Sequence, residues 1–233
     1  ILVAAKKHRI ERIVYASSAS VYGNPRYLPI NEDDRLNILN PYAASKLSAE
    51  NYCMAFYESY GVPVVILRYS NVYGMNQSPS NPYCGVVSKF FNSILEGSPP
   101  QIHGDGEQTR DFTFVDDAVE ATLLAGLFPK VVGEVLNVGT GKETSVKHLA
   151  YVIIELSGKE LRPIRIDRRD IDNLRRRVLN IEKIRKNLRW IPSTSLEEGL
   201  SKTYEWLISN RPEEVKRKPM KGLFISHRRH QHL

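Results

Sequence analysis

Apolar residues form short continuous runs along this chain, and longer segments with a helical period separate those runs. The run at 62–69 contains the block VVIL, which is typical of a parallel strand buried on both faces. Shorter apolar runs occur at 12–16 and 134–138, whereas 41–60 and 145–157 have the length and composition of helices. This alternation predicts an α/β fold built on a parallel sheet.

The helix predicted at 41–60 has clear end signals. Asn40 is a good N-cap, Pro41 suits the first helical position, and Gly61 is a typical C-terminal stop. The first six residues read as the end of another helix. The other predicted elements are helices at 85–97, 180–188 and 196–208, a strand that runs into a helix at 111–128, and a strand near 162–166.

Tyr42 and Lys46 carry the strongest chemical signal of the chain. Residues four apart on a helix share a face, so the Lys46 ammonium is expected one turn from the Tyr42 phenol. A nearby ammonium favours the phenolate, which can act as a base near neutral pH. Ser17 and Ser18 end the strand at 12–16, at the edge where open α/β sheets bind ligands. This pattern predicts redox chemistry on an alcohol, although an ordinary exposed helix pair is the structural alternative.

Several longer motifs follow one another in the chain. They are SSASVYG at 17–23, NPYAASK at 40–46, LRYSNVYG at 67–74, GDGEQTRDFTFVDD at 104–117, NVGTG at 137–141 and NLRWIPSTSLEEGL at 187–200. In these motifs the chain resembles the extended short-chain dehydrogenase/reductase family, in its NAD-dependent nucleotide-sugar epimerase/dehydratase branch. The resemblance covers roughly 1–208 and implies a Rossmann-type parallel sheet, NAD as cofactor and a UDP-sugar as substrate.

The resemblance also implies roles for individual residues. Tyr42 would remove the proton from a sugar hydroxyl, and Lys46 would hydrogen-bond the nicotinamide ribose. Ser18 would be the third catalytic residue, bridging substrate and Tyr42. Ser17 and Tyr69 join Tyr42 and Lys46 as expected cofactor-binding residues, although Ser17 also fits a structural position at the strand end.

The substrate side is expected at Asn71, Arg110 and Arg175. Asn71 matches a family position that hydrogen-bonds the sugar nucleotide, and Arg110 matches an arginine that holds diphosphate or ribose. The alternative for Arg110 is an ion pair with Asp111 or Asp117. The arginine-rich stretch that contains Arg175 departs from the family pattern, so the particular arginine that meets phosphate is left open.

The residues after Ser18 indicate which reaction of the family to expect. Sugar 4,6-dehydratases of this family place an Asp-Glu pair there, whereas this chain has Ala19 and Ser20, neither of which titrates. The form SASVYG is similar to that of UDP-sugar 4-epimerases, which pass through a transient 4-keto intermediate. We therefore expect 4-epimerisation and keep 4,6-dehydration as an alternative.

The glycine-rich turn of the family, G-x-x-G-x-x-G, does not occur in this sequence. The N-terminal part of the family fold is accordingly expected to be missing, and a catalytically inactive remnant or an interaction subunit is a further alternative. We assign 1–75, with 111–141, to the rest of the NAD-binding domain and 76–208 mainly to substrate binding. The basic tail at 209–233 is expected to be disordered.

Composition and charge limit the partners. The net charge is +7, but the basic excess lies in two segments, 162–189 with eleven Lys/Arg and four acidic residues, and 209–233 with seven and two. We therefore expect no nucleic-acid partner, and no segment has transmembrane length.

Cys53 and Cys84 lack paired spacing, which favours reduced thiols in a cytoplasmic protein. Metal binding is not expected, and a homodimer through the 41–60 helix is a candidate assembly.

Overall fold

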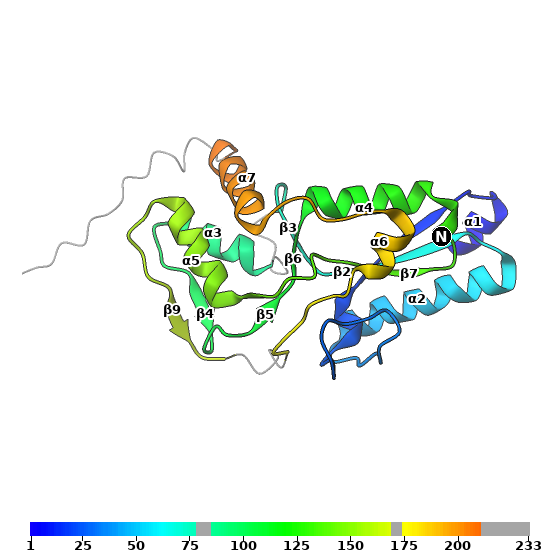
Figure 1. Cartoon of the computed structure of the whole chain (residues 1–233), viewed down its shortest axis with the longest axis horizontal. Helices are drawn as coiled ribbons and strands as arrows, with labels where there is room; N and C mark the ends of the chain where they lie inside the picture. The colour runs from blue at the N-terminus through cyan, green and yellow to red at the C-terminus, as the bar shows by residue number, and fades with distance from the viewer. Residues whose placement is uncertain (78–84, 169–173, 211–233) are drawn as a thin grey trace, which may run out of the picture.

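The computed structural model describes residues 1–77, 85–168 and 174–210, which form two lobes (Figure 1). The first, here called the sheet lobe, contains β1 (Ile13–Ser18), β2 (Val64–Tyr69) and β7 (Val135–Val138). These strands are parallel in the order β1-β2-β7, with Ile13 opposite Val64 and Ile66 opposite Val135. The predicted α/β fold with a parallel sheet is confirmed.

Both faces of β2 are covered by helices, which explains its continuous apolar sequence. Val64 and Ile66 pack toward α1 (Leu2–Lys7) and α2 (Pro41–Tyr60), whereas Val65 and Leu67 pack toward the opposite layer. That layer consists of α4 (Val115–Leu127) and α6 (Glu182–Leu188). Because successive side chains of a strand point to opposite faces, each face of β2 receives its own apolar pair.

Helix α2 begins and ends where the sequence predicts. The Asn40 side chain accepts a hydrogen bond of 2.8 Å from the Ala43 backbone N–H, and Gly61 ends the helix with a φ of +65°. The other predicted elements are also present. Besides those already described they are α3 (Val86–Leu95), α5 (Val146–Ser157), α7 (Leu196–Ser209) and β9 (Ile164–Ile166).

The second lobe, here called the helical lobe, packs α3 (Val86–Leu95), α5 (Val146–Ser157) and α7 (Leu196–Ser209) around one core. Two small sheets border it: β4 (Gln101–His103) pairs with β9, and β5 (Thr109–Arg110) pairs with β8 (Thr144–Ser145). Figure 1 shows the parallel pair of β3 (Asn71–Tyr73) and β6 (Phe112–Phe114) between the lobes. Two 3₁₀ turns complete the described elements, η1 (Ala19–Tyr22) and η2 (Pro129–Val131).

The short strands β3, β4, β5 and β8 were not predicted. The chain between 76 and 208, predicted to bind mainly substrate, also places α6 on the sheet lobe against β7. The predicted domain boundaries stay predictions, and Cys84, the loop at 78–84 and the tail beyond 210 lie outside the described residues.

Gly133 offers a test of packing behind the sheet. Its φ is +81°, and an added Cβ would lie 2.5 Å from the ring of Tyr57. Gly158 has a similar φ of +64° but nothing within 4 Å of an added Cβ. We expect Gly158→Ala to lower the free energy of unfolding by about 1 kcal/mol through backbone strain alone, and Gly133→Ala by a further ~1–3 kcal/mol through overpacking.

Urea unfolding of both variants measures this difference. If the two substitutions lower the free energy of unfolding equally, the Tyr57 ring moves aside without an energetic penalty, and this prediction is wrong.

Candidate active site

Tyr42 and Lys46 lie at the carboxyl end of β1, on the first two turns of α2. The Lys46 Nζ donates a hydrogen bond of 2.8 Å to the carbonyl of Ala16 and lies 5.7 Å from the centroid of the Tyr42 ring. The Tyr42 side chain is 55% exposed and therefore open to a ligand. The structure thus brings these two residues together at the edge of a parallel sheet where ligands bind in open α/β folds.

Ser17 and Ser18 point to different surroundings. The half-buried Ser18 is the N-cap of η1, where its Oγ accepts a hydrogen bond of 3.2 Å from the Ser20 N–H. Ser17 is buried, and its hydroxyl donates to the carboxylate of Glu50 on α2. Ser17 therefore links β1 to α2 inside the protein, and its cofactor-binding role stays a prediction.

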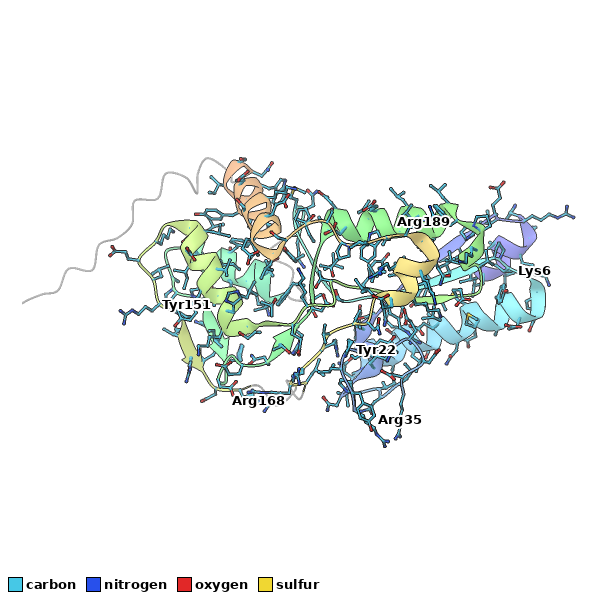
Figure 2. The ribbon with its side chains drawn as sticks, viewed as in Figure 1. Lys6, Tyr22, Arg35, Tyr151, Arg168 and Arg189 are labelled. Carbon is cyan, nitrogen blue, oxygen red and sulfur yellow. The ribbon has the colours of Figure 1, made fainter. Side chains whose placement is uncertain are left out.

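Glu50 belongs to a buried polar network beneath Tyr42 and Lys46. Its carboxylate accepts hydrogen bonds of 2.7 and 3.1 Å from the Arg68 guanidinium of β2. Arg68 also donates to the Tyr22 hydroxyl at 3.0 Å, and Tyr22 donates to Asn137 Oδ1 on β7 at 2.7 Å. Figure 2 shows Tyr22 at this position, inside the sheet lobe. Burial raises the pKa of Tyr22, so its hydroxyl stays protonated and can donate.

Tyr69 ends β2 on the face opposite Glu50. Its hydroxyl lies 2.6 Å from the Thr122 Oγ1 of α4, and burial raises the pKa of Tyr69. Tyr69 is thus held as a neutral phenol between the sheet and α4. Its expected contact with the cofactor stays a prediction.

The three residues predicted to bind substrate line one cavity of about 250 Å³ at the border of the helical lobe. Asn71 lies on β3 and Arg110 on β5, and Arg175 follows on the chain that returns toward the sheet lobe. The Arg175 Nη1 donates to Asp105 Oδ1 at 2.8 Å, in a half-exposed ion pair. Further lining residues are Val86, Gln101, His103, Gly104, Gln108, Val146, Arg168 and Leu174.

Asp111 and Asp117 are the alternative partners considered for Arg110. Both carboxylates accept hydrogen bonds from loop residues. The fully buried Asp111 carboxylate accepts from the N–H groups of Thr140, Gly141 and Leu179 and from the Thr140 hydroxyl. The net effect of burial is to raise the pKa of Asp111, although these donors oppose it. Asp117 accepts from the backbone and hydroxyl of Ser193 and the N–H of the next residue.

The sequence did not single out Glu50, and it did not distinguish Arg177 from the other arginines of its run. Glu50 stands four residues after Lys46, so the spacing that joined Tyr42 to Lys46 already placed it on the same face. Arg177 lies in a run of three arginines, and nothing local distinguishes it from Arg175. Its surroundings depend on residues far away in the sequence.

The exposed side of α2 carries Tyr52 and Tyr60, which are 66% and 53% exposed. Phe56 is half-buried in the core and contacts Tyr60 edge to face, with ring centroids 5.1 Å apart. A homodimer through this helix stays a proposal.

Among the described residues no helix meets the length and apolarity needed to cross a membrane, and no cluster of potential metal ligands occurs in that part of the chain.

The parallel sheet with helices on both faces, and Tyr42 and Lys46 at its carboxyl end, define a Rossmann-type α/β protein. Residues 1–139 match the model of the NAD dependent epimerase/dehydratase family, and the chain belongs to this family. The predicted family and its dependence on NAD are thereby confirmed.

Known relatives agree on the family and differ in the reaction. The chain is 40% identical over 211 residues to a putative UDP-glucose 4-epimerase from Methanocaldococcus jannaschii, covering 90% of this chain and 67% of that protein. It is 36% identical to the Thermotoga maritima UDP-glucose 4-epimerase solved with UDP-glucose, at a TM-score of 0.85, covering 89% of this chain and 67% of that one. A dTDP-D-glucose 4,6-dehydratase from Bos taurus is 37% identical, covering 89% of this chain and 58% of the relative. The chain thus spans about two thirds or less of the length of these relatives.

The Glu50–Arg68 pair predicts a large stability effect. Glu50→Gln leaves the buried Arg68 without a counter-charge, so we expect the free energy of unfolding to fall by ~3–5 kcal/mol. Glu58→Gln makes the same change on the exposed side of α2 and is expected to stay within about 0.5 kcal/mol of wild type.

Urea unfolding followed by circular dichroism measures both variants. If Glu50→Gln unfolds at the same urea concentration as Glu58→Gln, the ion pair does not stabilise the sheet lobe.

Proposed function

We propose that this chain provides the catalytic and substrate-binding parts of an NAD-dependent UDP-sugar 4-epimerase. The observation that carries the proposal is the pairing of Tyr42 with Lys46 at the carboxyl end of β1. The cavity lined by Asn71, Arg110 and Arg175 adds a site for the nucleotide. Conversion would pass through a 4-keto sugar.

In this proposal Tyr42 accepts the proton of the sugar 4-hydroxyl and later returns it. The Lys46 Nζ lies 5.7 Å from the ring centroid, so its positive charge stands beside the group that exchanges the proton. Ser18 would orient the hydroxyl by a hydrogen bond. When bound, NAD supplies the acceptor and the donor of hydride.

The residues present fit the nicotinamide end of NAD. Lys46 uses one N–H on the Ala16 carbonyl, and an ammonium has two more donors that could reach ribose hydroxyls. The pyrophosphate end of NAD has no such match, because the sequence contains no G-x-x-G-x-x-G turn to bind it. We infer that this chain binds the nicotinamide end of the cofactor. The alternative, that the chain is a catalytically inactive remnant, is based on the absence of the glycine-rich turn from this sequence.

The two residues after Ser18 support 4-epimerisation over 4,6-dehydration. Dehydration requires an acid and a base in addition to Tyr42, and the positions after Ser18 are Ala19 and Ser20. Ala19 is buried and Ser20 lies in η1, so neither provides a titrating group. We place the protein in the cytoplasm, acting on a UDP-sugar without nucleic acid, with a homodimer through α2 as the assembly to test.

Removal of the Tyr42 hydroxyl tests the base. We expect Tyr42→Phe to lower kcat by a factor on the order of 10²–10⁴, because proton transfer loses its acceptor. Tyr52→Phe removes a hydroxyl from the exposed face of the same helix and should retain wild-type turnover. The assay follows UDP-sugar interconversion with NAD present, and full activity of Tyr42→Phe would exclude this mechanism.

Titration with NAD separates the proposed enzyme from an inactive remnant. We expect saturable binding that Lys46→Met weakens about tenfold, since a charge-assisted donor to the ribose is lost. Isothermal calorimetry on the chain measures it. Absence of any NAD binding would favour the remnant.

A further inference from the structure

A second cavity, of about 310 Å³, lies in the loop at 23–37 between η1 and α2. Among the described residues it shares no lining residue with the cavity of the candidate active site, here called the substrate cavity. Its apolar part includes Tyr22 and Ile30, which are both buried. Figure 2 shows Tyr22 toward the sheet and Arg35 at the outer end of the loop. The volume lies at the lower end of the range of small-molecule sites.

Backbone contacts hold this loop in shape. An added Cβ at Gly23 would lie 2.0 Å from the Asn37 carbonyl oxygen, so the two ends of the loop touch. The Asn37 N–H donates to the Val21 carbonyl at 3.0 Å, and the Ile30 N–H donates to the Val178 carbonyl at 2.9 Å. The cavity is therefore present before a ligand binds, which lowers the entropic cost of binding.

Two arginines and two asparagines line the cavity. They are Arg26 and Arg35, with guanidinium groups, and Asn24 and Asn37, with amides. In the part of the chain that the structure describes, none of the four side chains forms a hydrogen bond or an ion pair. The lining also contains Asp34, whose carboxylate accepts a backbone N–H of the same loop at 2.8 Å. With two guanidinium groups and one carboxylate, the lining has a net charge of +1 and favours an anionic ligand.

Tyr27 adds an aromatic ring to the cavity. It is 78% exposed, and it forms no ring contact with another described residue. A planar base can stack on such a ring, while a guanidinium group binds a phosphate through two parallel hydrogen bonds. An asparagine amide pairs with adenine through its donor and its acceptor together. One class of ligand combines these three chemistries, namely an adenine nucleotide.

We propose that the loop at 23–37 binds an adenine nucleotide in a site separate from the substrate cavity. Arg26 and Arg35 bind its phosphate, and the base stacks on Tyr27. This site goes beyond the proposed function, because it uses no residue of the proposed catalytic or substrate-binding set.

Isothermal calorimetry of the whole chain with AMP tests this site. AMP is chosen because the substrate cavity is proposed to hold a uridine nucleotide, and the sequence contains no glycine-rich turn for a dinucleotide. We expect saturable binding at a single site. Arg26→Gln and Arg35→Gln should each weaken it about tenfold, since each removes a charge-assisted contact to the phosphate. Arg185→Gln, a change at an exposed arginine of α6 paired with Glu182, should leave it within about twofold.

Ribose 5-phosphate separates the two halves of the site. Tyr27→Ala should weaken AMP binding about tenfold, the effect of one base–aromatic stack, and leave the affinity for ribose 5-phosphate unchanged. Arg26, Tyr27 and Arg35 are all exposed, so we expect these variants to fold, and circular dichroism checks it.

Two results overturn this inference. One is the absence of AMP binding, or AMP binding that Arg26→Gln and Arg35→Gln leave unchanged. The other is displacement of AMP by saturating UDP-glucose, which would place AMP in the substrate cavity. If AMP binds at the loop while the chain binds neither NAD nor UDP-glucose, the proposed function fails and this site stands.

Discussion

The buried ion pair between Glu50 and Arg68 holds the catalytic side of this protein together. It joins the middle of α2 to the middle strand β2, while the hydroxyl of Ser17 attaches β1 to the same carboxylate. Tyr22 extends the network from Arg68 to Asn137 on β7. All three strands and the helix therefore meet at one set of polar contacts in a low-dielectric interior, where losing one partner is expensive.

The buried carboxylates of Asp111 and Asp117 hold loop segments by accepting hydrogen bonds from their backbone N–H groups. Asp111 follows β5 and gathers N–H groups from the loop after β7 and from Leu179, on the segment that returns to the sheet lobe. Asp117, at the start of α4, gathers those of Ser193 and Thr194 before α7. Because a carboxylate has several acceptor sites, Asp111 holds two chain segments and Asp117 holds one, none of which has regular strand pairing at these residues. Together with the contacts of β6 with α4 and α7, these hydrogen bonds connect the helical lobe to the sheet lobe.

Local signals predicted the long elements of the fold, and distant contacts decided the rest. Asn40, Pro41 and Gly61 fix both ends of α2 through their own backbone preferences, so the sequence was sufficient there. Strands β5 and β8 have two residues each, and they exist because Thr109 meets Ser145 from far along the chain. Distant contacts also explain why Arg175 and Arg177 have different surroundings. Their neighbours in the sequence are alike, but Asp105, far away along the chain, forms an ion pair with Arg175.

The proposed chemistry is divided between the two lobes. Tyr42 and Lys46 belong to α2 of the sheet lobe, whereas Arg110 belongs to β5, beside the core of α3, α5 and α7. A substrate held by its diphosphate on one lobe would reach a base on the other, so the relative position of the lobes decides where the sugar lies beside Tyr42. Asp111, adjacent in sequence to Arg110, accepts a hydrogen bond from Leu179 N–H on the segment that returns to the sheet lobe, and so helps to hold the two lobes in place.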